Sequence, residues 1–415
     1  MSEIVIKKSP PLCGNIICSG SKNASLPILA ATILTKGKSI IQNVPRLTDT
    51  ENMLQILADL GAQCSICVNT AEIDFTNCFE YSASYELMGS FRGSFFLAAP
   101  ILSRMGRARI SMPGGCPIGN RPIDLHLKGF AAMGAEIEYG HGYVDLFCKK
   151  LKGAKIYLDF PSVGATENLI MAAVLAEGET IIENAAAEPE ITDLANFLIK
   201  QGAKIHGAGS GTIKIFGVKQ LEPVTYRVIS DRIEAGTFMS AFAITGGHGR
   251  IENVNPMHLK PVTAKLTEMG ASIDEHRNYI NIDASKKLNS ANIKTLPFPG
   301  FPTDMQAQFC ALLCETQGNG IIIETVFENR FLHIGELNRM GANIRIDGRS
   351  SFIEGNKHLS GAKVCAMDLR GGASLVLAGL CADGETHIDG ANHIKRGYEN
   401  LCGKLRSVGA NIFLE

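Results

Sequence analysis

Polar and charged side chains recur where an expected strand passes into an expected helix. These junctions carry Lys22 with Asn23, Arg92, Ser162 with Thr166, Asp231 with Arg232, Asp304, and Asp368 with Arg370. Unpaired N–H groups and the helix dipole favour anions at such places. Each position alone is equally explained by helix capping or by a solvated cation. Together, with several cations among them, they predict an anionic substrate, and phosphate is the favoured group.

A second chemically suggestive feature is the Gly- and Pro-rich segment MPGGCPIGNRP at residues 112–122. This composition excludes a helix or a strand and predicts a loop. Cys116 lies in the loop near Arg121, where an exposed thiol beside a cation is more readily ionised and reactive. A loop cysteine without a role is an equally good reading of this pattern.

An internal repeat must position these residues. The dipeptide Gly-Ala ends an apolar segment of helical period, and it recurs about every 70 residues, at Gly61-Ala62, Gly134-Ala135, Gly202-Ala203, Gly270-Ala271, Gly341-Ala342 and Gly409-Ala410. Helices are expected before the glycines, for example at 49–60, 122–133 and 191–201. Short strands are expected at 38–43, 107–112, 179–184, 250–253, 321–325 and 385–389. The repeat therefore predicts six α/β units with mainly parallel strand pairing.

The sixth unit is short, because only five residues follow Ala410. Residues 3–7 and 14–19 match the pattern of 143–147 and 154–159 in the second unit. We therefore expect the N-terminal twenty residues to complete the last repeat. Three units per domain then give one domain at 21–228, which carries the Cys116 loop, and a second formed by 1–20 with 229–415.

Composition excludes several classes of protein. The 40 Lys and Arg residues balance 41 Asp and Glu residues, so a general nucleic-acid or membrane-surface binder is not expected. The longest apolar runs, at 26–34 and 169–176, are too short to span a bilayer. Residues 1–10 lack the features of a signal peptide, and the 12 cysteines are scattered, so a cytoplasmic protein is expected. Cys64 and Cys67 are better explained as small strand residues than as metal ligands.

Motifs in seven segments together closely resemble the enolpyruvyl transferase family, in the form that acts on UDP-N-acetylglucosamine. They are GSKNA at 20–24, PGGC and RPIDLH within 112–126, SVGAT at 162–166, ENAAAEPEI at 183–191, FPTDMQAQ at 301–308, ETVFENRF at 324–331 and RGYE at 396–399. The resemblance implies two inside-out α/β barrel domains, each of three βαβαββ units. It also implies enolpyruvyl transfer from phosphoenolpyruvate to the 3'-hydroxyl of UDP-N-acetylglucosamine, with phosphate released through a tetrahedral intermediate. This is the first committed step of peptidoglycan synthesis, and no metal or organic cofactor is expected.

The resemblance also assigns roles to individual residues. Lys22, Arg121 and Arg396 would hold the phosphate and carboxylate of phosphoenolpyruvate, with support from Asn23, Arg92 and Arg370. Cys116 would donate a proton to the methylene carbon and can add covalently to phosphoenolpyruvate. Asp304 would be the base for the sugar hydroxyl, and Asp368 would lie close to the reacting centre. The nucleotide sugar would contact Arg92, Arg121, Pro122, Ile123, Asp124, Leu125, Ser162, Val163, Asp304 and Val326.

One position departs from the pattern, and two other functions stay open. Residues 159–161 read Asp-Phe-Pro, so Phe160 stands where some family members have a lysine, which leaves one nucleotide contact in doubt. The first alternative is the sister transferase that makes 5-enolpyruvylshikimate-3-phosphate, which lacks the loop cysteine and the SVGAT and RPIDLH motifs. The second is a non-catalytic ring or scaffold. The net charge of -1 argues against a ring that encircles DNA.

Overall fold

The computed structural model describes residues 3–77, 80–112, 119 and 122–415. Its internal contacts divide the chain into two compact units. The C-terminal unit contains Met1–Ser19 and Ser230–Glu415, and the N-terminal unit contains Gly20–Gly115 and Arg121–Ile229. The chain passes from one unit to the other at Ser19–Gly20 and at Ile229–Ser230.

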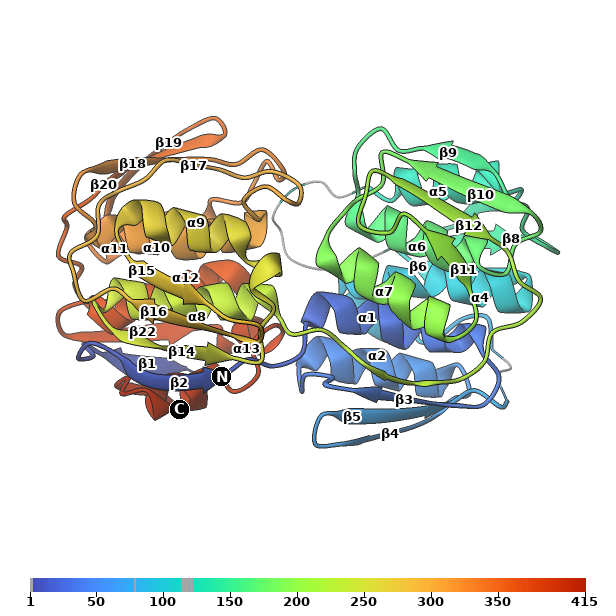
Figure 1. Ribbon diagram of the computed structural model, residues 1–415, viewed down its shortest axis with the longest axis horizontal. Coiled ribbons are helices and arrows are strands. Elements are labelled where there is room, and N and C mark those ends of the chain that lie inside the picture. Colours follow the sequence, from blue (N-terminus) through green and yellow to red (C-terminus); the bar gives the residue numbers. More distant parts are fainter. Residues whose placement is uncertain (1–2, 78–79, 113–118, 120–121) are drawn as a thin grey trace. The chain divides into compact units, whose positions relative to one another are not determined.

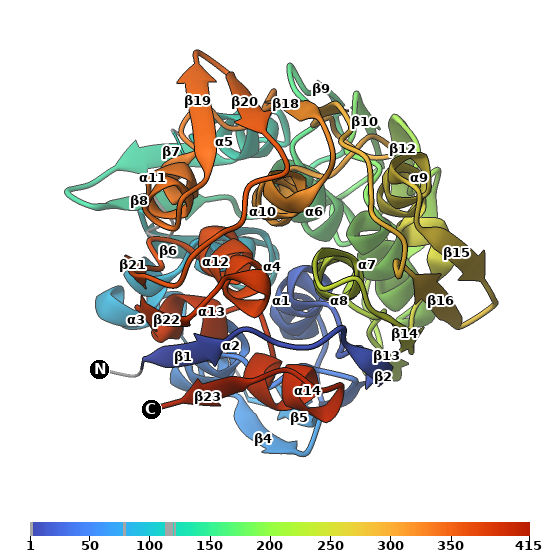
Figure 2. The same ribbon diagram turned by 90° about the vertical axis from the view of Figure 1, so that its left-hand side faces the viewer.

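The C-terminal unit is built from three four-stranded sheets around helices (Figure 2). The first sheet has the order β15-β16-β14-β2, formed by β15 (Ser272–Glu275), β16 (Tyr279–Asp283), β14 (His248–Glu252) and β2 (Cys13–Ile17). The second has the order β17-β18-β20-β19, formed by β17 (Ile293–Lys294), β18 (Asn319–Ile323), β20 (Ser350–Glu354) and β19 (Asn343–Asp347). The third has the order β21-β22-β1-β23, formed by β21 (Lys363–Cys365), β22 (Glu385–Asp389), β1 (Ile4–Lys7) and β23 (Ile412–Leu414).

The N-terminal unit repeats this plan. Its sheets have the orders β13-β3-β5-β4, β6-β8-β7 and β11-β12-β10-β9. The strands are β3 (Lys38–Gln42), β4 (Gln63–Cys67), β5 (Thr70–Asp74), β6 (Arg107–Ser111), β7 (Glu136–Tyr139), β8 (Tyr143–Phe147), β9 (Lys155–Tyr157), β10 (Glu179–Glu183), β11 (Lys204–His206), β12 (Thr212–Phe216) and β13 (Thr225–Arg227). The expected strands at 38–43, 107–112, 179–184, 250–253, 321–325 and 385–389 are all confirmed.

The helices form two classes that the sequence pattern separates. The inner helices are buried along most of their surface. They are α1 (Lys22–Ala31), α4 (Ala98–Met105), α6 (Val163–Ala173), α8 (Arg232–Ile244), α10 (Gln306–Glu315) and α12 (Leu369–Cys381). The others bury one face, and they are α2 (Thr48–Asp59), α3 (Tyr85–Ser90), α5 (Asp124–Ala132), α7 (Pro189–Lys200), α9 (Lys260–Met269), α11 (Leu332–Arg339), α13 (Ala391–Lys395) and α14 (Leu401–Ser407). Figure 1 shows this layering at the start of the chain, where α2 lies between α1 and the sheet that contains β3. Sheets outside and helices inside confirm the inside-out arrangement.

All six Gly-Ala pairs end a helix as predicted. Each glycine has a positive φ, between 93° and 109°, a conformation that costs other residues strain but that glycine adopts freely. Each following alanine is at most 9% exposed and lies in the core of its unit. A separate hydrophobic core fills each unit. No helix in the described part of the chain is long and apolar enough to cross a membrane.

The expectation of mainly parallel pairing is wrong. Each four-stranded sheet has one parallel pair, such as β9 with β10, and two antiparallel pairs. The reason is the short connection between the last two strands of each unit. In β4 and β5, for example, Cys67 lies opposite Thr70, and such a tight hairpin forces antiparallel pairing. Three of the five parallel pairs of described strands are joined through an inner helix, whereas β2 with β14 and β13 with β3 pair across a long stretch of the chain.

The N-terminal segment closes the C-terminal unit in two places. β1 pairs with both β22 and β23, with Ile4 opposite Ile388 and Leu414, which confirms that it completes the sixth repeat. The second half of the expectation is wrong, because β2 pairs in parallel with β14 and starts the fourth repeat. The pattern match located both strands, but pairing also depends on the loop between them. β13 closes the N-terminal unit in the same way, in parallel with β3.

Deleting residues 1–8 should lower the melting temperature of the protein markedly. β1 lies between two partners, so its removal leaves the edges of both β22 and β23 unpaired. A matched control is the Lys7→Ala, Lys8→Ala double variant. It removes only exposed ion pairs with Glu385 and Asp383, which contribute about 0–1 kcal/mol each. Differential scanning calorimetry of both proteins gives the comparison, and an unchanged transition in the deletion would contradict this role of β1.

Candidate active site

In the N-terminal unit, Lys22 occupies the first position of α1. The Oγ of Ser21 caps this helix by accepting a hydrogen bond from Ala24 N at 3.2 Å. The Lys22 Nζ lies 2.8 Å from Asp49 Oδ2, and both side chains are largely buried. A cation at a helix N-terminus opposes the helix dipole, so helix stability does not explain a lysine here. In the structure Asp49 is its counter-ion, and Asn23 is half-buried beside it.

The structure brings together several of the residues expected to bind the nucleotide sugar. The Nη2 of Arg92 donates to the Pro122 carbonyl at 3.3 Å, and Ile123, Asp124 and Leu125 follow at the start of α5. Ser162 caps α6 by accepting from Ala165 N, and Val163 is the first residue of that helix. These residues form a cluster of two helix N-termini and one guanidinium group within this unit.

Buried His126 links the two helices of this cluster. Its Nδ1 lies 3.0 Å from the Nδ2 of Asn168 on α6, and a Cβ placed on Gly164 would lie 3.3 Å from its Cε1. Burial, and then the positive charge of Arg92, lower the pKa of His126 to about 3. His126 is therefore a neutral structural residue. Exposed Phe160 precedes Ser162, at the position where the sequence departs from the family pattern.

A buried carboxyl group lies on the same helix as Ser162. Glu167 is 1% exposed, and neither of its oxygens has a hydrogen-bond partner among the described residues. Burial raises its pKa well above the usual value, and the nearby Glu190 and Glu188 raise it further. The folded protein therefore favours the protonated form of Glu167.

Glu167→Gln should make the protein more stable, and increasingly so as pH rises. The folded state holds a proton on Glu167 that the unfolded state releases above a pKa of about 4.3, so this residue lowers stability as pH increases. Glutamine does not ionise and removes that dependence. Melting temperatures at pH 5 and pH 8 give the test, with exposed Glu177→Gln as the control. A gain that is equal at both pH values would contradict a protonated Glu167.

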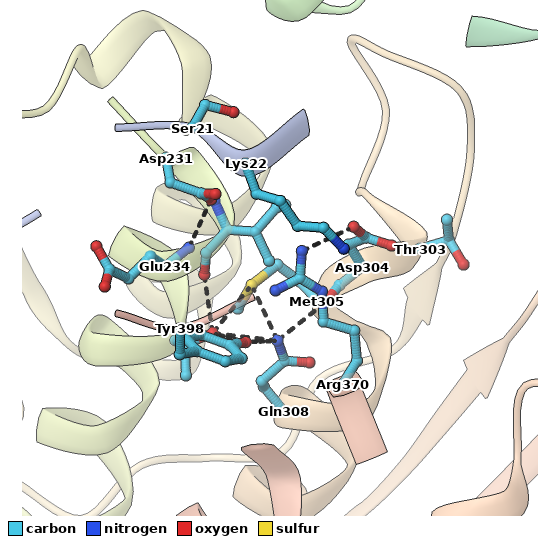
Figure 3. Close-up of polar contacts among 12 residues, drawn as sticks. Ser21, Lys22, Asp231, Glu234, Thr303, Asp304, Met305, Gln308, Arg370 and Tyr398 are labelled. Atoms are coloured by element: carbon cyan, nitrogen blue, oxygen red, sulfur yellow. Dashed lines mark hydrogen bonds and ion pairs between the residues drawn. The ribbon is translucent and has the colours of Figure 1, made fainter. Parts of the chain in front are cut away.

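In the C-terminal unit, two buried arginines share the carboxylate of Asp304. Figure 3 shows the contact with Arg370. The Nη2 of Arg330 lies 2.6 Å from Asp304 Oδ1, and the Nη2 of Arg370 lies 3.1 Å from Oδ2. The arginine side chains are 6% and 4% exposed, whereas that of Asp304 is 25% exposed. Burial favours the neutral carboxyl group, but Arg330 and then Arg370 outweigh it and hold the pKa of Asp304 well below its ordinary value.

A network of hydrogen bonds connects Arg330 to the carboxylate of Glu324. Thr303 Oγ1 accepts from Arg330 Nη1 at 2.9 Å and donates to Glu324 Oε2 at 2.7 Å. The other oxygen of Glu324 accepts from Thr295 Oγ1 at 2.9 Å and from the N–H of Val326 at 2.8 Å. Glu324 thus holds the backbone of Val326 and orients Arg330 through Thr303.

Both arginines have buried N–H groups that do not contact Asp304. The Nε and Nη1 of Arg370 and the Nε of Arg330 have no hydrogen-bond partner in the described part of the chain. A buried donor without an acceptor is costly, and more so on a charged group. A ligand with carboxylate or phosphate oxygens would supply the missing acceptors, since guanidinium groups match those anions in geometry. The arrangement could therefore hold an anion, with Asp304 as the counter-ion that the structure shows.

The remaining expected residues are placed as follows. Asp368 caps α12 and accepts from the N–H groups of Arg370 and Gly371, both at 2.9 Å, so it fixes the backbone that carries Arg370. Arg396 is half-buried at the end of α13. Cys116 and Arg121 lie outside the described residues. Cys64 and Cys67 both lie on β4, and the described residues contain no group of three or more His, Cys, Asp and Glu side chains placed to hold a metal ion.

Sequence reasoning assigned no role to Arg330, Glu324 or Thr303. All three lie inside FPTDMQAQ and ETVFENRF, two of the motifs on which the family resemblance rests. Their presence in these motifs was the one sequence feature that could have pointed to a role. Their function was hidden because it depends on contacts between distant positions. Arg330 and Arg370 lie 26 and 66 positions along the chain from Asp304.

Comparison with known proteins gives consistent results. Residues 6–405 match the family model described as EPSP synthase (3-phosphoshikimate 1-carboxyvinyltransferase). The chain is 54% identical over 412 residues to UDP-N-acetylglucosamine 1-carboxyvinyltransferase 1 of Caldanaerobacter subterraneus, and 55% identical over 414 residues to UDP-N-acetylglucosamine 1-carboxyvinyltransferase 2 of Carboxydothermus hydrogenoformans, with 99% of each chain covered. Among solved structures, the enolpyruvyl transferase NikO from Streptomyces tendae superposes with a TM-score of 0.91 at 25% identity, covering 100% of this chain and 98% of NikO. The EPSP synthase of Acinetobacter baumannii gives a TM-score of 0.80 at 20% identity, with full coverage of both chains, and shares the fold.

Proposed function

Because the chain belongs to the EPSP synthase family of enolpyruvyl transferases, we propose that it transfers the enolpyruvyl group of phosphoenolpyruvate to the 3'-hydroxyl of UDP-N-acetylglucosamine and releases phosphate. The acceptor is supported by relatives at 51–55% identity that are named for this reaction and match over nearly the whole chain. The structural observation that supports the proposal is the buried arginine pair at Asp304. Its members keep buried N–H groups that have no acceptor among the described residues and that an anion could bind. In the proposed pathway this is the first committed step of peptidoglycan synthesis.

Phosphoenolpyruvate brings two anionic groups, and the proposal assigns cations to each. Arg330 and Arg370 bind the carboxylate, because each has at least one buried N–H group without an acceptor among the described residues. Lys22, Arg121 and Arg396 bind the phosphate and assist with the carboxylate, and Asn23 and Arg92 support them. Fixed cations stabilise the charge that develops during addition without reorganisation at the moment of reaction.

Asp304 acts as the base that removes the proton from the sugar hydroxyl. While both arginines hold its carboxylate its pKa is very low, and a carboxylate in this state is a poor base. The carboxylate of phosphoenolpyruvate competes for the same two guanidinium groups. Its binding therefore loosens the ion pairs of Asp304 and raises the basicity of this residue when the second substrate is present.

The reaction then proceeds by addition and elimination. The sugar oxygen bonds to C2 of phosphoenolpyruvate while a proton is delivered to C3, which gives a tetrahedral intermediate. Loss of a proton from C3 and departure of phosphate from C2 restore the double bond. Cys116 delivers the proton to C3, and Asp368 lies close to the reacting centre. The nucleotide sugar is held by Arg92, by residues 121–125, by Ser162 and Val163, and by Asp304 and Val326.

The proposed location is the cytoplasm, since the ten described cysteines are all free thiols, as in a reducing compartment.

Phosphate release tests the proposal. The purified protein is given phosphoenolpyruvate alone, with UDP-N-acetylglucosamine, or with shikimate 3-phosphate. Release only in the second mixture is the expected result. Release only in the third would instead assign the sister reaction of EPSP synthase. No release in any mixture would favour the non-catalytic scaffold, for which a gel-shift assay with DNA is the complementary measurement.

A further inference from the structure

Three buried polar side chains are hydrogen-bonded to one another beside the Asp304–Arg370 ion pair. Figure 3 labels two of them, Gln308 and Tyr398. Thr237 comes from α8, Gln308 from α10, and Tyr398 from the segment between α13 and α14. They are 1%, 0% and 3% exposed. Three hydroxyl and amide groups removed from water must be hydrogen-bonded to one another or to the backbone to avoid a large desolvation cost.

The hydrogen bonds of this triad have defined directions. Thr237 donates its only hydroxyl hydrogen to the Ile233 carbonyl at 2.8 Å. In the 2.9 Å contact between Thr237 Oγ1 and the Tyr398 hydroxyl, Tyr398 is therefore the donor. The Nε2 of Gln308 lies 3.1 Å from Thr237 Oγ1 and 3.2 Å from the Tyr398 oxygen, and it donates toward both. The phenol oxygen is thereby fixed in place from two sides.

The triad also contacts both members of the ion pair. The Nε2 of Gln308 donates to the backbone carbonyl of Asp304 at 2.9 Å. The guanidinium carbon of Arg370 lies 5.3 Å from the centre of the Tyr398 ring, within range of a cation–π interaction. Burial raises the pKa of Tyr398, against the opposing effect of Arg370, so the group next to Arg370 is a neutral phenol. Arg370 therefore packs against an uncharged phenol that the other two side chains hold in place.

We propose that Tyr398, held by Thr237 and Gln308, is a positioning residue that orients Arg370 and Asp304 for the carboxylate of phosphoenolpyruvate. The inference rests on the proposed function for the identity of that substrate. The hydroxyl of Tyr398 adds no charge and contacts no reacting atom. Its effect is to restrict the rotamers of a long, flexible cation, which would otherwise lose conformational entropy each time an anion binds.

Tyr398→Phe is the direct test, because it keeps the ring against Arg370 and removes only the hydroxyl. Loss of one buried hydrogen bond that orients Arg370 should raise KM and Kd for phosphoenolpyruvate by about three- to tenfold. KM for UDP-N-acetylglucosamine should stay within about twofold of the wild-type value, because the variant removes no contact proposed for that substrate. The double variant Thr237→Val with Tyr398→Phe should be no worse than the weaker-binding single variant, because both remove the same interaction.

Tyr226→Phe provides the matched control. Tyr226 is a second largely buried tyrosine, in the N-terminal unit, and its hydroxyl donates to Asp193 Oδ1 at 2.7 Å. This variant should lower the melting temperature and leave KM for phosphoenolpyruvate unchanged. Calorimetric binding of phosphoenolpyruvate in the presence of UDP-N-acetylglucosamine is measured for every variant, so that the result does not depend on turnover.

The outcomes separate the inference from the proposed function. If wild-type protein binds phosphoenolpyruvate but does not transfer it, the proposed function fails, and the binding ratio still decides the role of Tyr398. Wild-type affinity in Tyr398→Phe would overturn the inference. Equal loss of affinity for both substrates, with a fall in melting temperature like that of Tyr226→Phe, would also overturn it by showing a purely structural role. Wild-type protein that binds no phosphoenolpyruvate at all would overturn both.

Discussion

Asp304→Asn should lower kcat by about 10²- to 10⁴-fold, the range expected when a general base is removed. The carboxamide keeps the shape of the side chain but cannot accept the hydroxyl proton. It also withdraws the anion that competes for Arg330 and Arg370. Affinity for phosphoenolpyruvate should therefore be retained or increased while turnover is lost, and this divergence between binding and catalysis distinguishes the base from a residue that only holds substrate.

Steady-state rates and calorimetric binding of phosphoenolpyruvate give the two quantities. The control is Asp347→Asn, an exposed aspartate of the same unit on β19, which should leave both unchanged. Turnover close to that of the wild-type protein would remove Asp304 from the role of base. Loss of phosphoenolpyruvate binding together with turnover would show instead that Asp304 is needed to keep the two buried arginines in place.

Arg370→Lys should raise KM for phosphoenolpyruvate by about 10- to 100-fold, the effect of losing a charge-assisted hydrogen bond. Lysine keeps the positive charge and can still pair with Asp304. It lacks the planar set of N–H donors, including the buried Nε and Nη1 that have no acceptor among the described residues. The expected loss therefore measures geometry and not charge.

Initial rates at varied phosphoenolpyruvate, with UDP-N-acetylglucosamine saturating, give this effect. Arg339→Lys is the matched control, because Arg339 lies in the same unit and its pair with Glu336 is exposed on the arginine side. An unchanged KM for phosphoenolpyruvate in Arg370→Lys would show that a point charge is sufficient and that the spare donors are not the carboxylate site.

The repeat made most of the fold predictable. Glycine is almost the only residue that adopts the positive φ at the end of each helix without strain, so the Gly-Ala pairs located helix ends closely: the helix expected at 49–60 is α2 (Thr48–Asp59), and that expected at 191–201 is α7 (Pro189–Lys200). The strand directions were wrong because apolar alternation locates a strand without specifying its partner. β2 illustrates this, since its pattern was recognised but its partner, β14, lies more than two hundred residues away.

The site was only partly predictable for a related reason. Lys22 and Asp304 are polar residues at helix starts, which is a local signal. Arg330, Gln308 and Tyr398 carry no such signal, because a buried arginine or tyrosine is identified by what surrounds it. Their surroundings come from separate segments of the chain that only the folded unit brings together. These are the Asp304 carboxylate, the hydrogen-bonded pair Thr303 and Glu324, and the Thr237 hydroxyl.

The chemical identity of the nucleotide product tests the central claim most directly. After incubation with phosphoenolpyruvate and UDP-N-acetylglucosamine, mass spectrometry and NMR spectroscopy should show an enolpyruvyl ether at the 3' oxygen of the sugar, formed in equal amount to the phosphate released. Unmodified UDP-N-acetylglucosamine, or an enolpyruvyl group found only on shikimate 3-phosphate when both acceptors are offered, would contradict the account.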